Sequence, residues 1–198
     1  MLQSVTTLQQ ILFDLSGILP ADAQPLFSVT RPAQLAANAV YIPEGDRSKK
    51  LAFIEKGIIR AYRVKDNGDE ATLFLRWEGQ FAASHDTIIH SRPSRFIYRA
   101  LEDTSLLEID YDVLETVLKA HTEYEPLRNF FLMKMLAESL DLIETFVTLS
   151  PEERYRRLVK DKFDIVNRVP DKYIASMLGI TPVSLSRIRK RIHARGQH

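Results

Sequence analysis

The stretch from Asp171 to Lys190, DKYIASMLGITPVSLSRIRK, constrains the fold of this chain more than any other. Its apolar and small residues recur at the spacing of two short helices, and they are Ile174, Ala175, Leu178, Gly179, Ile180, Leu185 and Ile188. A close helix crossing needs a short side chain such as Ala175, and the bend needs a residue such as Gly179 that tolerates positive φ. Thr181 and Pro182 are typical of a helix start. The stretch predicts a helix-turn-helix.

The second helix, expected from Thr181 to about Ile192, has a polar and basic face opposite its apolar contacts. The residues expected to meet DNA are Thr181, Val183, Ser184, Arg187, Lys190 and Arg191. Arg187 is best suited to read a guanine, Val183 can meet a thymine methyl, and Ser184 suits phosphate. A helical hairpin without DNA contacts can show the same pattern. The charge of residues 172–198, six basic side chains and no acidic one, favours DNA.

The net charge of +1 hides an asymmetry between the two ends of the 198-residue chain. Residues 150–198 carry 12 Lys and Arg against 5 Asp and Glu, whereas residues 1–149 carry 15 against 21. A basic module attached to an acidic body is typical of nucleic-acid binding. The absence of cysteine excludes disulfides, thiolate catalysis and cysteine-ligated zinc or iron–sulfur centres. No signal sequence or long apolar run is found, so we expect a cytoplasmic protein without a membrane segment.

Between Val40 and Ile109 the pattern changes to that of strands. Glycines at regular spacing separate the β-rich runs LAFIEKG, IIRAYRV and ATLFLRW, and the runs RFIYRALE and SLLEID follow. This pattern predicts an antiparallel sandwich or jelly roll. Asn67-Gly68 favours a type I′ hairpin turn. The first forty residues predict a helix and then irregular segments broken by prolines, a cover for this domain.

A long helix with two apolar stripes is expected next, over residues 125–149. One stripe, with heptad-like spacing, consists of Met133, Leu136, Leu140, Ile143 and Val147. The other, nearly opposite, consists of Phe131, Met135, Leu142 and Phe146. A surface helix needs one buried face, so two faces predict a helix between its own β domain and a second copy of the chain. Burial of the whole helix inside one monomer is the alternative.

Ser150, Pro151 and Glu153 form a capping-box pattern that begins a further helix, so the domain boundary is expected at Leu149/Ser150. The predicted organisation is α+β: an antiparallel β-roll sensor domain with its helical cover over residues 1–124, the dimerisation helix over 125–149, and an all-α helix-turn-helix domain over 150–198. Basic residues of the new helix, from Arg154 to Lys162, are expected to form a solvated face.

With these parts in order, the chain resembles the Crp/Fnr superfamily of bacterial transcription regulators. The segments that carry the resemblance are IPEGD (42–46), LAFIEKGIIRAY (51–62), EGQFAAS (78–84), ALEDTSLLEID (100–110) and LGITPVSLSRIR (178–189). The resemblance implies a homodimer that binds a near-palindromic double-stranded DNA operator. It also implies RNA polymerase and a small-molecule effector as further partners.

The resemblance also shows a departure in the segment that we call the cassette, residues 81–95. In cyclic-AMP-binding members this segment resembles F-G-E followed by R-[ST]-A, in which the Glu holds the ribose and the Arg holds the phosphate. Here Ser84 stands at the Glu position and Ser94 at the Arg position, while Arg95 lies one residue away. We therefore expect an effector other than cyclic AMP. A pocket formed by Trp77, Ser84, Arg95 and Tyr98 is the candidate ligand site, unless the chain's own side chains fill it.

Alternative functions follow from the same residues. A cyclic nucleotide could still be bound through a shifted contact at Arg95, and the β-roll could instead be a protein-interaction adaptor without specific DNA binding. A cupin-type metal enzyme needs a His-x-His pair, which the sequence lacks. His85, His90 and His121 are candidates for haem ligation only because they are histidines. We expect no enzymatic activity, no cofactor and no metal.

Overall fold

The computed structural model describes residue 13 and residues 24–195, so the N-terminal helix expected from the sequence lies outside the described residues. The chain divides into two compact units, residues 1–61 with 75–137, and residues 62–74 with 138–198. Within residues 24–195, no helix is both long and apolar enough to cross a membrane.

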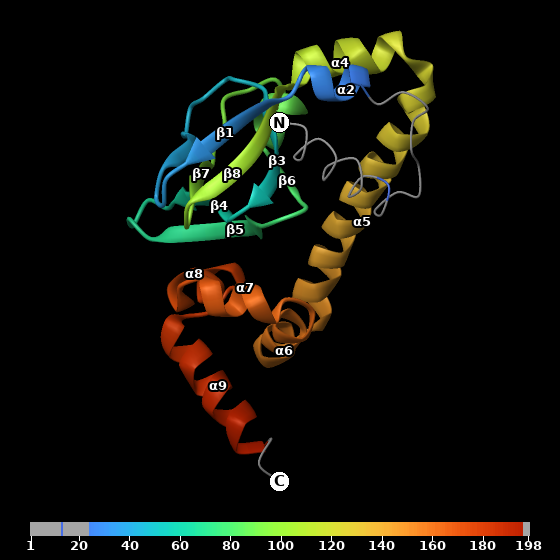
Figure 1. Cartoon of the computed structure of the whole chain (residues 1–198). Coiled ribbons are helices and arrows are strands. Elements are labelled where there is room, and N and C mark those ends of the chain that lie inside the picture. Colours follow the sequence, from blue (N-terminus) through green and yellow to red (C-terminus); the bar gives the residue numbers. More distant parts are fainter. Residues whose placement is uncertain (1–12, 14–23, 196–198) are drawn as a thin grey trace. The chain divides into compact units, whose positions relative to one another are not determined.

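The strands form two antiparallel sheets, which Figure 1 shows as the blue-to-green arrows of a β-roll. One sheet has the order β1-β8-β3-β6 and the other the order β2-β7-β4-β5. The first sheet consists of β1 (Arg31–Leu35), β8 (Thr104–Asp110), β3 (Lys50–Lys56) and β6 (Phe81–Ala83). The second consists of β2 (Val40–Ile42), β7 (Ile97–Ala100), β4 (Ile59–Val64) and β5 (Glu70–Arg76). The predicted antiparallel roll is confirmed.

Inward-facing aliphatic and aromatic side chains of both sheets form the core of the roll. Ile42, Ile54, Ile59, Leu106 and Tyr98 are completely buried. The close approach of β3 and β8 requires Gly57, because its φ is +103° and a Cβ at this position would lie 2.3 Å from Thr104 Oγ1.

The β4–β5 hairpin differs from the expected type I′ turn. The Gly68 N–H donates to Lys65 O at 2.9 Å, and the Lys65 N–H donates to Asp69 O at 2.8 Å. Gly68 has positive φ but Asn67 does not, whereas a type I′ turn needs both. The connection is therefore a three-residue loop that ends in a left-handed glycine. Asn67 is held in it by hydrogen bonds between its amide group and Asp69.

Helices close one end of the roll. Short α2 (Gln24–Ser28) contacts α4 (Tyr111–Ala120), which is followed by the 3-10 helix η1 (Thr122–Tyr124), and Figure 1 shows α2 and α4 side by side. Leu26, Tyr124 and Leu127 form the buried cluster between them. α4 was not predicted from the sequence, although Asp110 caps it by accepting from two backbone N–H groups. β1 was not predicted either, because Pro32 was interpreted as a residue that breaks secondary structure. β1 is an edge strand, where proline is tolerated.

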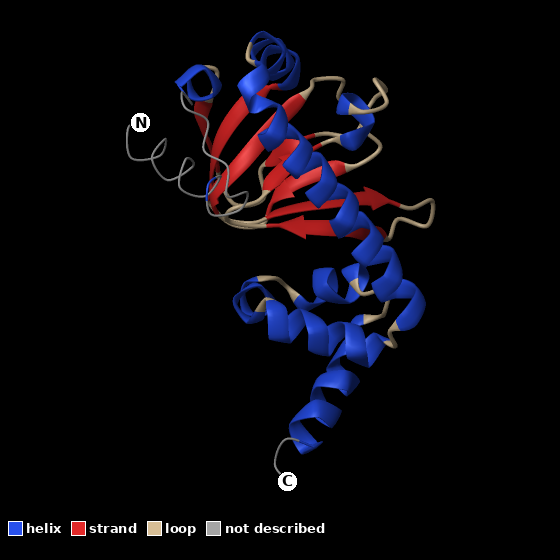
Figure 2. Cartoon of the chain, turned by 90° about the vertical axis from the view of Figure 1, so that its right-hand side faces the viewer, coloured by secondary structure: helices blue, strands red, loops and turns tan. Residues whose placement is uncertain are grey.

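The long helix α5 (Glu125–Thr148) has the length expected from the sequence and is the longest blue helix in Figure 2. Phe131, from the second stripe, packs against Phe81 at 5.5 Å between ring centroids, so this end of the stripe contacts the chain's own β-roll. The other residues of the second stripe, Met135, Leu142 and Phe146, are 43 to 47% exposed, so the predicted packing of this face on the β domain is limited to Phe131. All five residues of the first stripe are exposed, from 51% for Leu136 to 78% for Val147. Burial of the whole helix inside one monomer is therefore wrong for this chain.

The C-terminal helices are α6 (Pro151–Asp161), α7 (Phe163–Arg168), α8 (Asp171–Met177) and α9 (Pro182–Arg195). The capping box predicted at Ser150 and Glu153 is present at the start of α6. Gly179, at the bend, has φ +70°. Thr181 Oγ1 accepts from the Ser184 N–H at 3.2 Å, and α9 begins at Pro182 as expected. The helix continues three residues beyond the expected Ile192.

Candidate nucleic-acid interface and effector cassette

The two helices α8 and α9 pack through the residues that the pattern predicted. Ile174, Ala175 and Leu185 are fully buried, and Leu178 and Ile188 are nearly so. Because the apolar side of α9 is used in this contact, its opposite side is left to solvent. Val183 is 61% exposed, and Thr181, Arg187, Lys190 and Arg191 are also exposed, while Ser184 is half-buried.

The basic residues of α9 fall into two groups. Arg189 is half-buried and donates to Tyr155 Oη at 2.9 Å and to Asp171 Oδ2 at 2.7 Å, so it joins α9 to α6 and α8. Arg191 donates to Glu152 Oε2 at 3.1 Å. Within the described part of the chain, Arg187 and Lys190 make no ion pair and no side-chain hydrogen bond. Their charge is therefore available to an external anion.

The basic face of α6 is more neutralised than its sequence suggests. Arg156 pairs with Glu152 at 2.9 Å, and Arg157 pairs with Asp141 at 2.6 Å. Arg154 is half-buried and lies over the Phe146 ring at 4.7 Å. Arg154 and Arg157 thus join α6 to α5, whereas Arg156 pairs within α6. Lys160 and Lys162 are exposed, the solvated position expected for the whole face.

In the cassette, the two serines that replace the charged residues of cyclic-AMP-binding members lie together. Ser84 Oγ donates to Ser94 Oγ at 3.1 Å, and both side chains are buried. Ser94 Oγ in turn donates to Phe96 O at 2.8 Å. Tyr98 is buried beside Ser84, and burial raises the pKa of its hydroxyl to about 12. This neutral cluster has no charged group of its own.

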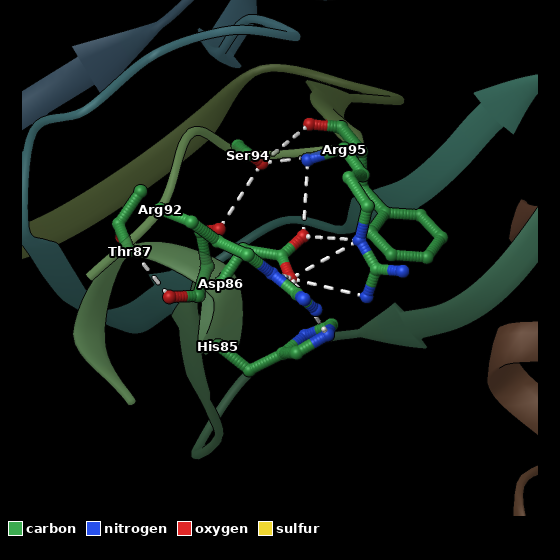
Figure 3. Close-up of polar contacts among 8 residues, drawn as sticks. His85, Asp86, Thr87, Arg92, Ser94 and Arg95 are labelled. Atoms are coloured by element: carbon green, nitrogen blue, oxygen red, sulfur yellow. Dashed lines mark hydrogen bonds and ion pairs between the residues drawn. The ribbon is translucent and has the colours of Figure 1, made fainter. Parts of the chain in front are cut away.

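Directly next to the serine cluster, a buried carboxylate binds two arginines (Figure 3). Asp86, in the four-residue helix α3 (His85–Ile88), is completely buried. Its Oδ1 accepts from Arg92 Nε at 2.8 Å, and its Oδ2 accepts from the Arg95 backbone N–H at 3.0 Å and from Arg95 Nε at 3.1 Å. Burial alone would raise the pKa of Asp86, but the hydrogen bonds from Arg95 and Arg92 outweigh it and hold the pKa well below its usual range.

His85 lies at the edge of this ion cluster. Its Nε2 is 3.6 Å from Asp86 Oδ1, and its ring packs on Phe96 at 5.6 Å between centroids. Burial lowers the pKa of His85, and the positive charges of Arg95 and Arg92 lower it further against the opposing effect of Asp86. The imidazole is therefore neutral at pH 7.

The structure brings together only part of the predicted pocket. Ser84 and Tyr98 are buried neighbours, whereas Arg95, in the loop before β7, is exposed and held by Asp86. Trp77 follows β5, and its backbone N–H donates to Gln80 Oε1 at 3.2 Å. Asp86 and Arg92 were not predicted as site residues from the sequence, since only the folded loop between α3 and β7 brings them into contact. Among the described residues, no three His, Asp or Glu side chains are placed to hold a metal ion.

The chain is similar to one family model and to several solved structures. Residues 32–121 match the model of the cyclic nucleotide-binding domain. No curated protein matches the sequence at a significant level. Among solved structures, the regulator CLP of Xanthomonas campestris, described as responsive to c-di-GMP, matches with a TM-score of 0.67 and 18% identity over 87% of this chain and 91% of that chain.

Two further structures match to a similar extent. A CooA mutant from Carboxydothermus hydrogenoformans has a TM-score of 0.69 and 18% identity, over 93% of this chain and 85% of that chain. FixK2 from Bradyrhizobium japonicum has a TM-score of 0.67 and 17% identity, over 85% and 86%. The β-roll thus matches the cyclic nucleotide-binding domain family, and the chain has the fold of the Crp/Fnr-type transcription regulators. Of these three solved structures, CLP is described as a global regulator.

Proposed function

We propose that this chain is a homodimeric, sequence-specific DNA-binding transcription regulator whose effector is not cyclic AMP. The observation that carries the proposal is the outer face of α9, where Arg187 and Lys190 stand exposed with no acidic partner among the described residues. The proposed functional segments are the sensor domain, residues 1–124, the dimerisation helix, 125–149, and the DNA-binding domain, 150–198.

Each residue on the outer face of α9 has a proposed role in DNA recognition. Arg187 reads a guanine through O6 and N7, and Val183 meets a thymine methyl. Thr181 and Ser184, at the start of the helix, contact phosphate together with Lys190 and Arg191. Because Arg191 is also bonded to Glu152, its phosphate contact is weaker than that of Lys190.

The exposed first stripe of α5 supports the homodimer. Five apolar side chains at heptad-like spacing, left open to solvent in one chain, are typical of a helix that pairs with its own copy. A two-fold dimer places its two recognition helices in successive major grooves about 34 Å apart, so the operator is a near-palindrome. RNA polymerase and an unidentified small-molecule effector are further proposed partners.

The alternatives are less well supported by the same geometry. A cyclic nucleotide bound through Arg95 would compete with Asp86 for the Nε edge of that guanidinium. A protein-binding adaptor would need an acidic or apolar outer face on α9, and this face is basic.

Matched substitutions on α5 test the dimer. Leu140→Glu would place two like charges in the proposed seam, so self-association should weaken by roughly 100-fold or more, with loss of operator binding. Leu142→Glu makes the same chemical change on the opposite stripe and should leave a dimer. Sedimentation velocity measures both variants. A dimeric Leu140→Glu protein would show that the first stripe is not the interface.

A further inference from the structure

The ion cluster around Asp86 has a role that the proposed function does not explain. An ionised carboxylate removed from water is costly unless charged donors surround it. Besides its hydrogen bonds to Nε atoms, Asp86 Oδ1 lies 2.7 Å from Arg92 Nη2 and 3.1 Å from Arg95 Nη2. Both arginines therefore direct the Nε–Nη2 edge of the guanidinium at one carboxylate. This is the edge that also fits an external phosphate or carboxylate in bidentate fashion.

The two arginine side chains reach the protein surface, whereas the carboxylate that they bind does not. Their side chains are 45% and 53% exposed, whereas Asp86 is wholly buried beneath them. Two cations so close together at a protein surface attract an anion, because their mutual repulsion needs compensation. In this chain the compensating anion belongs to the chain itself. It lies in α3, six and nine residues before the arginines that it binds.

Hydrogen bonds between uncharged groups hold the rest of the cassette. The Asp86 backbone carbonyl accepts from the Arg92 N–H at 3.0 Å, which closes the loop between α3 and β7. The hydroxyls of Ser84 and Ser94 are bonded to each other. The loop is thus held in one conformation by contacts that lie entirely within the sensor unit.

We propose that Asp86 is a built-in anion that saturates the Arg92–Arg95 pair. It keeps the cassette in its closed conformation without an external anionic ligand. Removal of this carboxylate converts the pair into a binding site for small oxyanions, either carboxylates or phosphate. The consequence for regulation, namely DNA binding without an added anionic effector, rests on the proposed function.

The test is chemical rescue of the full-length Asp86→Ala protein, read by thermal unfolding. In sodium chloride, the unfolding midpoint of Asp86→Ala should lie roughly 5 to 15 °C below that of wild type, because two clustered cations lose their partner. Sodium formate, acetate or phosphate at the same ionic strength should restore at least half of this loss in a saturable manner. Wild type should not respond to these anions beyond chloride. This readout does not involve DNA, so its failure is distinguishable from failure of the proposed function.

Two controls make the rescue specific. Asp46→Ala removes a carboxylate of the same unit that is bonded to Ser48 and not to an arginine, and it should show no rescue. Adding Arg95→Ala to Asp86→Ala should abolish the rescue. Should Asp86→Ala fail to fold, Asp86→Asn keeps the size of the side chain and removes its charge, and phosphate should stabilise it more than it stabilises wild type.

Two results would overturn the proposal. One is a saturable rise of the wild-type midpoint with phosphate or a cyclic nucleotide that Arg95→Ala abolishes, because the arginine pair would then accept an external anion with Asp86 in place. The other is an Asp86 variant that folds and responds to oxyanions no more than wild type does.

Discussion

The arginines of the cassette and those of α9 differ in what compensates their charge. Arg92 and Arg95 share a buried carboxylate from α3, the helix that precedes their loop. On α9 the charges are divided, because Arg189 is neutralised by Asp171 whereas Arg187 has no acidic partner among the described residues. Residual charge, rather than the mere presence of arginine, therefore marks the surface that faces an external anion. By this criterion the C-terminal domain is open to a polyanion and the cassette is closed.

The largest effect is expected where an arginine of α9 is structural. Arg189→Ala removes the hydrogen bonds to Tyr155 and Asp171, and it should lower the free energy of unfolding by roughly 1.5 to 3 kcal/mol. Chemical denaturation measures the loss. The folded fraction of the variant should keep the base preference of wild type. A changed preference would mean that Arg189 also contacts bases, so that it could not be separated from Arg187 as a purely structural arginine.

Arg187→Ala should have the converse effect. We expect stability to be unchanged within about 0.5 kcal/mol, because the side chain is exposed. Affinity for the cognate operator should fall by about 1 to 3 kcal/mol, with preference lost at one base pair in each half-site. Fluorescence anisotropy with single-base operator variants measures this. An equal loss on every sequence would remove Arg187 from base reading.

Lys190→Ala should weaken binding to all sequences alike. One lost phosphate contact lowers the slope of log affinity against log salt by about 0.9. Arg191→Ala should lower the slope less, because Glu152 already neutralises part of the charge of Arg191. A titration of affinity with salt compares the two variants. A larger decrease for Arg191 would show that its pair with Glu152 opens on DNA.

The smallest effect concerns His85. Its pKa is lowered in the folded protein, so the neutral imidazole is favoured and the resulting stability is present above the unfolded pKa of about 6.5. That stability is lost as the pH falls below this value. Unfolding midpoints between about pH 7 and 5 should therefore decline less in His85→Gln than in wild type. Identical declines would show that burial and the neighbouring positive charges do not lower the pKa of His85 in the folded protein.

Local signals account for what could be predicted from the sequence. Gly179, Thr181 and Pro182 each act through their own backbone or cap, so the turn and the start of α9 were readable. The alternating strands of the β-roll were readable for the same reason. The type I′ turn at Asn67-Gly68 was wrong because Asn67 bonds to Asp69 in a longer loop.

Non-local contacts explain the rest. Glu152 and Arg191 lie 39 residues apart in the sequence, and no pattern within either helix indicates that they pair. Asp86 was not singled out from the sequence, since its burial and its two partners depend on the path of the chain between α3 and β7. Arg95 was identified as a charged residue near the cassette, but the sequence could not show that its charge is already compensated.

Selection of DNA from a randomised pool by the wild-type chain, with no added nucleotide or other effector, is the most direct test. The predicted result is enrichment of a near-palindrome whose half-sites lie about one helical turn apart, and loss of one base preference per half-site in Arg187→Ala. Enrichment that appears only after cyclic AMP or cyclic GMP is added would contradict the closed cassette, and no enrichment in either condition would contradict the assignment of α9 to DNA.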